Sequence, residues 1–381
     1  MKNYIENQIE LLNHLNKRTD PEGLRIQKML GMSDLTRRTD SPIRYVVDAI
    51  LTAPSLKDCD IVDFPLIVPV KNNFDLLGTS PEHPSRRPSD TFYVDPQHVL
   101  RTQTTTMWTY YLRDPEILKK LKRTGRLSAF SCGAVYRRDE IDRFHYPVFH
   151  QADGLCITES LTKKFIIDDL VVILSEIARA IYGPDVQWRV KDDTFPFTTP
   201  SIQLEILWNE AWLEVLGAGL VQPKVLALLD LDPGQYNGWA FGYGLDRLAM
   251  IKMNIPDIRI LWSEDSRIRR QFTGLNSVFH EVSKFPPVDR DISFVISKTV
   301  ALNSFYEIVR ECGRLQDEDL IEEVKLLDTY ANEARFGADQ VSYTFRIRYR
   351  SHIRTLLNDE INQIQETVRS KTTTELKALL R

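Results

Sequence analysis

Two adjacent arginines open the segment that carries the most varied chemistry in the sequence, VYRRDEIDRFHYPVFHQADG at residues 135–154. A strand presents every second side chain on one face, so we expect Arg137 and Asp139 to point the same way. The planar guanidinium of an arginine can bind a phosphate through two hydrogen bonds. Phe149, on the next expected strand, can stack on a base. The alternative interpretation is a charged hairpin on a solvent-facing surface.

A second candidate is GWAFGYGLDRLAM at residues 238–250, where glycines flank Tyr243. Glycine lets the backbone approach a ligand closely. Arg247 follows in the first turn of an expected helix, where its charge adds to the positive end of the helix and favours anion binding. The alternative is an ordinary strand, turn and helix with a surface arginine, because a lone GxG is a weak signal.

Two further segments offer aromatic and hydroxyl groups. In FPF, Phe195 and Phe197 are spaced to face one side of an expected strand and contact an aromatic ligand edge to face, with core packing as the alternative. HPSRRPSDTFYV at residues 83–94 precedes LRTQTTTM at residues 100–107. We interpret the second of these as a threonine-rich strand end that supplies hydroxyl donors, with a plain β-branched strand as the alternative.

The hydrophobic pattern predicts a mixed scaffold to position these groups. Residues 161–183 are the clearest helix, because apolar residues recur every three or four positions before Gly183 and Pro184. QLEILW, AWLEVLGAGLV and WAFGYGL predict strands. After residue 285 the expected order is strand, helix, strand, strand, helix, which is typical of a ferredoxin-like α+β domain.

We therefore expect four segments along the chain. They are a helical lead-in (residues 1–60), a catalytic domain (61–262), a polar linker that ends before Pro286 and Pro287 (263–284), and the ferredoxin-like domain (285–381).

The composition argues against several classes of protein. The 381 residues are 43% hydrophobic and 27% charged, and no apolar run approaches the roughly 20 residues of a membrane-spanning helix. The four cysteines, Cys59, Cys132, Cys156 and Cys312, lie far apart, so we expect neither a disulfide framework nor a zinc site. A net charge of −4 gives no global sign of nucleic-acid binding, although a local basic face can suffice.

In order and spacing, these segments resemble the α-chain core of phenylalanyl-tRNA synthetase, a family of class II aminoacyl-tRNA synthetases. VYRRDEID…FHQ resembles motif 2, GWAFGYGLDRLAM resembles motif 3, and NIPDIRILWSEDSRIRRQF resembles the stretch that follows motif 3. FPPVDRDISFVI resembles the start of the ferredoxin-fold anticodon-binding domain that single-chain, mitochondrial-type members carry at their C-terminus. The resemblance runs from about Asn72 to Arg381, and SDLTRR, from Ser33, is similar to the family's N-terminal region.

The resemblance implies an α+β fold with an antiparallel six-stranded sheet flanked by helices. The implied activity is the ATP-dependent attachment of L-phenylalanine to tRNA-Phe. The reaction would proceed through phenylalanyl-adenylate, and the 2′-hydroxyl of the terminal adenosine would accept the amino acid.

The resemblance also implies which residues bind ATP. Arg137 falls on the motif 2 arginine, which bridges the amino acid carboxylate and the α-phosphate. Arg247 falls on the motif 3 arginine, which binds the γ-phosphate, so these two are the expected catalytic residues. The remaining positions are Phe149 beneath the adenine, Asp139 and His145 lining the ATP site, and Glu214 as a weak ligand of Mg²⁺.

The implied amino acid pocket is lined mainly by aromatic and small residues. Phe195 and Phe197 grip the phenyl ring, Gln151 contacts the amino acid, and Ala240 forms a floor that leaves room at the para position. Gly217 and Gly219, on the strand that follows, complete the pocket. An apolar pocket rejects one added hydroxyl only about a hundredfold. Because the chain has no room for the family's editing domain, we expect measurable misactivation of tyrosine.

Three positions of the amino acid site depart from the family's pattern. The family usually has histidine where Gln103 stands, serine where Thr105 stands, and glutamate where Asp153 stands. That acid normally meets the amino group of the substrate, and Gln103 can form hydrogen bonds but cannot become cationic. All three lie on one side of the site, so a changed substrate or a changed rate stays open, whereas the ATP side matches.

The C-terminal domain carries a basic stripe. TFRIRYR places Arg346, Arg348 and Arg350 on one strand face, with Arg354 just beyond. This stripe suits phosphate contacts to an anticodon stem-loop. The alternative is a solvated edge strand that its charges protect from pairing.

The expected partners are tRNA-Phe and L-phenylalanine, without a membrane, and the expected assembly is a monomer. We expect a mitochondrial matrix location, with the cytoplasm as the alternative. Glu6 and Glu10, with no arginine before Arg18, make the N-terminus a poor transit peptide, so either a leader has been removed or none exists. Two other functions stay open, a paralogue that activates another amino acid and an RNA-binding or regulatory relative. The retained arginines and C-terminal domain argue against them.

Overall fold

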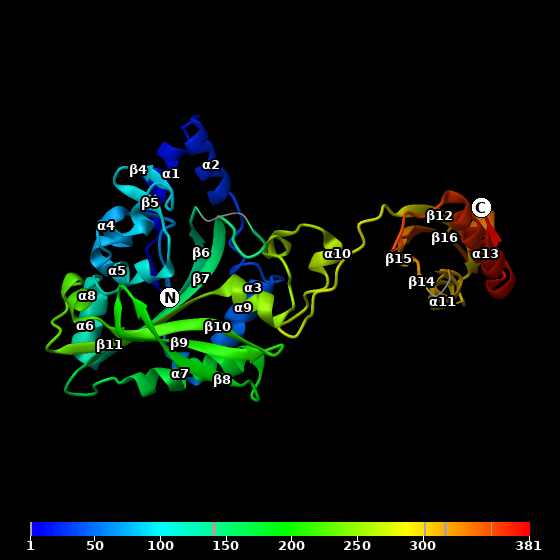
Figure 1. Cartoon of the computed structure of the whole chain (residues 1–381). Coiled ribbons are helices and arrows are strands. Elements are labelled where there is room, and N and C mark those ends of the chain that lie inside the picture. The colour runs from blue at the N-terminus through cyan, green and yellow to red at the C-terminus, as the bar shows by residue number, and fades with distance from the viewer. Residues whose placement is uncertain (1, 139–141, 301, 316–317, 352) are drawn as a thin grey trace. The chain divides into compact units, whose positions relative to one another are not determined.

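A sheet of long strands organises the larger part of the chain (Figure 1). The structure, a computed structural model, describes residues 2–138, 142–300, 302–315, 318–351 and 353–381. The chain divides into two units, Met1–His280 and Glu281–Arg381. Each unit has a hydrophobic core of its own.

The large sheet of the first unit contains the antiparallel six-stranded core that the resemblance implies. Two short strands extend it at one edge, because β2 pairs in parallel with β6, and β1 in parallel with β2. In spatial order the strands are β1 (Lys2–Asn3), β2 (Asp60–Asp63), β6 (Arg126–Tyr136), β7 (Val148–Glu159), β11 (Tyr236–Gly244), β10 (Ala211–Val221), β9 (Thr198–Trp208) and β8 (Trp188–Phe195).

One face of this sheet packs against helices. Side chains alternate along the strands, so Ile202, Leu204 and Ile206 all enter the core on this side. The covering helices are α3 (Pro42–Ile50), α7 (Ile167–Tyr182) and α9 (Leu245–Lys252). The predicted helix at 161–183 starts six residues later than expected, where the Asp169 carboxylate accepts the backbone N–H of Ile166 at 2.9 Å.

The other face is covered by short elements that form a second core. They are α4 (Val70–Asn73), α5 (Met107–Tyr111), α6 (Pro115–Thr124), α8 (Pro223–Leu228) and a small antiparallel sheet of β3 (Ile67–Pro69), β5 (His98–Leu100) and β4 (Tyr93–Asp95). Near the N-terminus lie α1 (Ile9–Leu15) and α2 (Pro21–Leu30). The 3-10 helices are η1 (Ile5–Gln8), η2 (Pro54–Leu56), η3 (Asp75–Leu77), η4 (Pro84–Arg86), η5 (Thr104–Thr106) and η6 (Ile258–Trp262).

The first unit extends beyond the expected catalytic segment at both ends. The expected lead-in, residues 1–60, supplies α3 to the main core and β1 to the sheet. The expected linker, residues 263–284, contains α10 (Ser266–Arg269) and the buried side chain of Phe272, and most of it belongs to the first unit. The segment was predicted to be a linker because it is mostly polar. A few of its apolar residues nevertheless pack on the core, including Ile268 and Phe279.

The main elements of the second unit follow the predicted order of strand, helix, strand, strand and helix, and a short strand is added after them. Its sheet is antiparallel, in the order β15 (Ile321–Tyr330), β16 (Gln340–Tyr349), β12 (Val288–Ser297) and β17 (Leu379–Leu380). The helices are α11 (Asn303–Cys312), α12 (Glu333–Phe336) and α13 (Asn358–Leu376), and β13 (Arg314–Leu315) pairs with β14 (Glu318–Asp319). Phe294, Phe305 and Phe345 form the centre of its core.

Candidate active site

A cavity of about 200 Å³ lies on the sheet face opposite α7, beneath the segment that joins β5 to α5. Its wall is formed by strands β7, β10 and β11, the turn between β8 and β9, η5 with α5, and Arg137, the residue after β6. The lining residues are Gln103, Thr104, Thr105, Trp108, Arg137, Gln151, Ala152, Asp153, Phe195, Phe197, Thr198, Gly217, Ala218, Ala240, Phe241, Gly242 and Tyr243. The cavity thus combines residues from all four segments that the sequence singled out, although they lie far apart along the chain.

The threonine-rich segment is held over the cavity by Asn73, which is fully buried. The Asn73 carboxamide oxygen accepts the backbone N–H of Thr102 and the hydroxyl of Thr106, each at 3.1 Å. Gln103 donates its side-chain N–H to the Asn73 carbonyl at 3.2 Å. The segment is therefore a 3-10 turn fixed by a buried amide, and the expected strand ends before it, at Leu100.

Asp153 is the buried acid of the cavity, with only 3% of its surface exposed. One carboxylate oxygen accepts the Thr105 hydroxyl at 2.7 Å, and the other accepts the indole N–H of Trp108 at 2.8 Å. Burial raises the pKa of Asp153 to about 7, although both hydrogen bonds favour the ionised form. A carboxylate in this state is well suited to a ligand that brings its own positive charge.

The FPF segment forms the tight turn between β8 and β9, and the prediction that it lies on one strand face was wrong. Phe195 ends β8, whereas Phe197 lies in the turn after Pro196. Both rings nevertheless line the cavity. A Cβ at Gly217 would lie 2.7 Å from the Phe195 ring, so this glycine makes room for the ring, and Gly219 likewise makes room for Thr198 at 2.6 Å.

Two further predicted residues complete the cavity. Gln151, on β7, accepts the backbone N–H of Thr104 at 3.3 Å. Ala240, on β11, is 3% exposed and belongs to the cavity wall, where its methyl group leaves space that a larger side chain would fill.

Arg137 lies at the end of β6, at the boundary of the cavity. Its Nε–H donates to the Thr102 carbonyl at 3.1 Å, and its guanidinium carbon lies 5.2 Å from the centre of the Phe149 ring. The arginine and the aromatic ring that the sequence placed on neighbouring strands are thus adjacent in space. This pairing offers a cation beside a flat apolar surface, which suits a nucleotide.

Arg247 lies in the first turn of α9, as predicted, and is exposed. None of the residues that the structure describes forms an ion pair or hydrogen bond with it. Its neighbour Asp246 is buried and accepts both the backbone N–H and the Nδ1–H of His150, which lies between Phe149 and Gln151 on β7. Sequence reasoning missed this contact between the two motifs.

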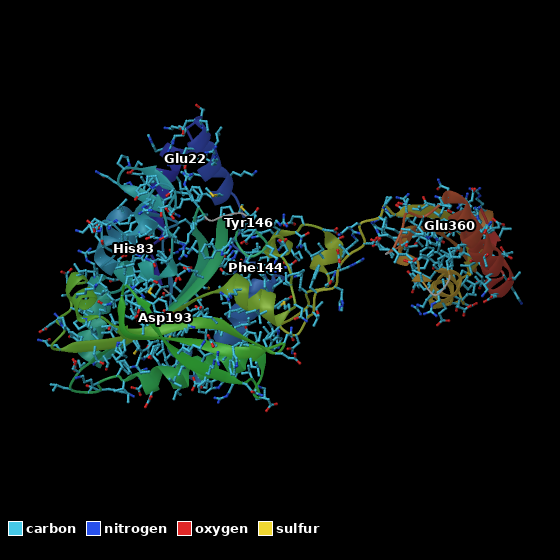
Figure 2. All side chains as sticks on the ribbon, viewed as in Figure 1. Glu22, His83, Phe144, Tyr146, Asp193 and Glu360 are labelled. Carbon is cyan, nitrogen blue, oxygen red and sulfur yellow. The ribbon has the colours of Figure 1, made fainter. Side chains whose placement is uncertain are left out.

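His145 and Glu214 do not belong to the cavity wall. His145 lies in the segment joining β6 to β7, next to Phe144 and Tyr146, which Figure 2 labels. Its exposed ring is 2.8 Å from Asp142. Glu214 is exposed on β10, opposite Glu205 in the strand register. Asp139 lies outside the described residues.

A second cavity of about 340 Å³ adjoins the first and shares Gln103, Arg137 and Phe197 with it. Its other walls come mainly from the HPSRRPSDTFYV segment, through His83, Ser85, Asp90 and Thr91. The Arg137 guanidinium therefore borders both spaces, so a group bound in either can reach it.

Each of the four C-terminal arginines is already paired with a carboxylate. Arg346 forms two hydrogen bonds with Asp291, at 2.8 and 2.9 Å, and Arg348 forms the same pair with Asp289. Arg350 pairs with Glu322, and Arg354 with Glu360 on α13 (Figure 2). The pairing lowers the pKa of Asp289, Asp291 and Glu360.

The described residues were also compared with what a membrane-spanning helix and a metal-binding cluster would require. Over the part of the chain that the structure describes, no helix has the length and apolar character needed to cross a membrane. Within the same residues, no group of three or more metal-binding side chains comes together.

Comparisons with known proteins identify the family of each unit. Residues 27–272 match the family described as tRNA synthetases class II core domain (F), and residues 283–381 match the ferredoxin-fold anticodon binding domain. The chain is 39% identical to the chloroplastic/mitochondrial phenylalanine–tRNA ligase of Arabidopsis thaliana, over 92% of this chain and 80% of that protein. It is 30% identical to the mitochondrial phenylalanine–tRNA ligase of Saccharomyces cerevisiae, over 97% of this chain and 94% of that protein.

Proposed function

The chain belongs to the phenylalanine–tRNA ligase family of class II aminoacyl-tRNA synthetases, and on this premise we propose how its own residues attach L-phenylalanine to tRNA-Phe. The observation that carries the proposal is the composition of one cavity. It combines a buried acid, two phenylalanine rings and an arginine at its boundary. These groups complement the ammonium group, the phenyl ring and the carboxylate of phenylalanine, respectively.

In this reading, the amino acid enters with its α-ammonium group toward Asp153 and its ring between Phe195 and Phe197. Edge-to-face contacts favour aromatic rings over aliphatic side chains of similar volume. The carboxylate then points toward Arg137, which borders the cavity. Gln151 supplies a further polar contact to the amino acid.

ATP would bind beside Arg137, with its adenine on the Phe149 ring and its γ-phosphate on Arg247. In the first step, a carboxylate oxygen of phenylalanine attacks the α-phosphorus, and the bond from that phosphorus to the bridging oxygen breaks. Phenylalanyl-adenylate forms and pyrophosphate leaves. No protein nucleophile is required, because positioning and stabilisation of charge by arginine lower the barrier.

Class II synthetases use a divalent metal with ATP. The carboxylates of Glu205 and Glu214 are the candidate ligands for such an ion here. The Glu205 carboxylate already accepts hydrogen bonds from Arg189 at 2.7 Å and from Lys191 at 2.8 Å, so it is a poor ligand for a metal ion. Glu214 stands opposite Glu205 in the strand register, and none of the described residues forms an ion pair with it. One carboxylate suits Mg²⁺ that is held mainly by the phosphates of ATP. When bound, the ion would neutralise phosphate charge.

In the second step, the 2′-hydroxyl of the terminal adenosine attacks the carbonyl carbon of the adenylate. The bond between that carbon and the phosphate oxygen breaks, AMP leaves, and the hydroxyl proton passes to phosphate or solvent. The C-terminal unit would contact the anticodon stem-loop through Arg346, Arg348, Arg350 and Arg354. Those contacts require the arginines to exchange carboxylate partners for phosphates.

Two of the three departures from the family's pattern, Thr105 and Asp153, share a hydrogen bond, and the third, Gln103, lines the same cavity. Thr105 donates to Asp153, and Gln103 is turned toward Asn73. A shorter acid is thus held by a hydroxyl and an indole, which supports an intact ammonium site. We accordingly propose phenylalanine as the substrate.

The setting follows from the relatives. The Arabidopsis and Saccharomyces proteins are named as organellar enzymes. We therefore propose a mitochondrial location for this chain. We also propose that it acts as a monomer, since its two units together supply both the catalytic cavity and the anticodon-binding fold.

The test is aminoacylation by the full chain, with phenylalanine, ATP and tRNA-Phe transcripts that end in either 2′-deoxyadenosine or 3′-deoxyadenosine. The proposal predicts charging of the 3′-deoxy transcript and none of the 2′-deoxy transcript. Adenylate formation without charging of either transcript would instead indicate a paralogue that activates amino acids outside translation.

A further inference from the structure

Trp108 contacts both recognition elements of the proposed amino acid site. Its indole N–H donates to Asp153 at 2.8 Å. Its ring meets Phe197 nearly edge on, with ring centres 6.1 Å apart and an interplanar angle of 71°. Trp108 is 1% exposed and lines the cavity. One side chain therefore connects the buried carboxylate to the aromatic wall.

The hydrogen bonds on Asp153 leave its carboxylate with capacity to spare. A carboxylate offers about four acceptor positions, of which Trp108 and Thr105 use one on each oxygen. The remaining positions suit an ammonium group that enters from the cavity. Both donors also fix the orientation of the carboxylate. Because aspartate is one methylene shorter than glutamate, the Asp153 carboxylate has little freedom to change that orientation.

Few other charged or titratable groups surround Asp153. On β6, Ser131 stands opposite it in the register, and Arg137 is the cation that lines the same cavity. On β11, Gly242 stands opposite it, and the neighbouring Tyr243 is the titratable group. Thr105 and Trp108 are the contacts from η5 and α5. Among the described residues, the two donors are thus the main determinants of the local geometry.

We propose that Trp108 is a positioning residue for the α-ammonium group of the substrate, acting through Asp153. Its N–H holds the carboxylate toward the cavity in an ionised form, while its ring supports Phe197 against the phenyl group. The inference rests on the proposed function, since it assigns Asp153 to the ammonium group. The inference adds Trp108, which follows the threonine-rich turn, to the residues that determine the affinity for the amino acid.

The opposing interpretation is that Trp108 only fills the core. The two interpretations differ in which ligands they affect. Loss of a core ring weakens every ligand that contacts the aromatic wall. Loss of the N–H weakens only ligands that carry an ammonium group. L-phenylalanine and 3-phenylpropionate differ by that group alone, so their affinity ratio separates the two cases.

The experiment measures binding of both ligands to the full chain by calorimetry or competition. ATP is left out, so that protonation of its phosphates does not contribute to the pH dependence of binding. Trp108→Phe removes the N–H and keeps an aromatic ring. We expect phenylalanine to bind roughly ten- to a hundredfold more weakly, because a hydrogen bond to a charged group is lost. Binding of 3-phenylpropionate should change by less than about twofold.

Three further variants make the result specific. Replacement of Trp108 by 3-benzothienylalanine keeps the bicyclic ring without the N–H, and should reproduce the effect even where Trp108→Phe folds poorly. Trp212→Phe makes the same substitution at an exposed tryptophan of β10 that does not line the cavity, and should leave the affinity ratio near that of the wild type. Phe197→Leu alters the aromatic wall and should weaken both ligands by a similar factor.

The pH dependence provides an independent readout. Phenylalanine needs Asp153 ionised, so its affinity falls as the pH drops below the pKa of the carboxyl group. Without the Trp108 N–H that pKa moves up, and the fall should begin at a higher pH in Trp108→Phe. An unchanged pH profile with equal weakening of both ligands would overturn the positioning role. A wild-type chain that prefers phenylalanine no more than 3-phenylpropionate would instead refute the proposed function itself.

Discussion

The buried imidazole of His150 lies 3.1 Å from the Asp246 carboxylate through Nδ1 and accepts the backbone N–H of Leu35 on Nε2, also at 3.1 Å. Because a backbone N–H can only donate, Nε2 must be the acceptor, and Nδ1 carries the proton. His150 lies between Phe149 and Gln151, and Asp246 precedes Arg247. This contact therefore joins the strand and the helix that present the proposed nucleotide and amino acid ligands.

Asp246→Asn should disturb both halves of the site. The carboxylate accepts two hydrogen bonds from His150, whereas an amide has one acceptor oxygen and would present a donor to the other N–H. We expect a loss of about 1–3 kcal/mol in stability and a raised KM for ATP. All six tryptophans lie between residues 108 and 262, so fluorescence during urea unfolding reports the first unit alone.

Arg247→Gln is the matched comparison for that experiment, because Arg247 is exposed in the next position of α9. It should raise the KM for ATP and leave the urea midpoint near that of the wild type. Equal midpoints for Asp246→Asn and the wild type would show that the buried contact contributes nothing to folding.

Asp153→Asn should stabilise the free protein while weakening phenylalanine binding. Burial raises the pKa of Asp153 from 3.8 to about 7, so the folded state binds a proton more tightly than the unfolded state. Wild-type stability therefore falls as the pH rises through this window, and is constant above it. The asparagine keeps the shape without the charge, so its advantage should grow to at most about 4 kcal/mol above pH 7.

Urea unfolding at pH 5 and pH 8 measures this difference. Asp192→Asn, at an exposed acid on the edge strand β8, serves as the control and should show no such pH dependence. If Asp153→Asn were less stable than the wild type at pH 8, the cost assigned to the buried charge would be wrong.

Ala240→Gly should increase activation of tyrosine. Ala240 lines the cavity, and removal of its methyl group enlarges the space expected at the para position of the substrate ring. The wild type should already activate tyrosine measurably, and the variant should raise kcat/KM for tyrosine by roughly tenfold. Pyrophosphate exchange with each amino acid measures both values, and unchanged tyrosine kinetics would remove Ala240 from the pocket floor.

Asp291→Asn should strengthen tRNA binding. The carboxylate neutralises Arg346 through two hydrogen bonds, and its removal frees that arginine for phosphate. We expect the Kd for tRNA-Phe to fall about two- to fivefold at low salt, with a steeper salt dependence. Glu366→Gln removes the same charge from the exposed side of α13 and should have a smaller effect. An unchanged Kd in Asp291→Asn would exclude Arg346 from the RNA interface.

Much of the site could be predicted because its residues lie on regular elements with clear periodicity. Arg137 and Phe149 were placed on adjacent strands, and they meet. Arg247 was placed at a helix start, where it lies. The main strands and helices of the second unit also followed from the hydrophobic pattern, whereas the short α12 and the pair of β13 and β14 were not expected.

Contacts between distant segments could not be predicted in the same way. Asn73, Trp108 and His150 act through buried hydrogen bonds to residues 29 to 115 positions away, and no local period records such pairs. FPF was predicted to be part of one strand, but the chain turns at Pro196, so β8 ends at Phe195. One signal was available and missed: Asp289 and Asp291 alternate along one strand as Arg348 and Arg346 alternate along another, which favours cross-strand pairing.

The most direct test of the central claim is amino-acid-dependent exchange between pyrophosphate and ATP by the full chain, followed by charging of tRNA-Phe. We predict exchange with L-phenylalanine, weaker exchange with L-tyrosine, and charging of tRNA-Phe with phenylalanine. Absence of phenylalanine-dependent exchange in a folded preparation would contradict the account. It would mean that the cavity lined by Gln103, Thr105 and Asp153 serves another substrate, or none.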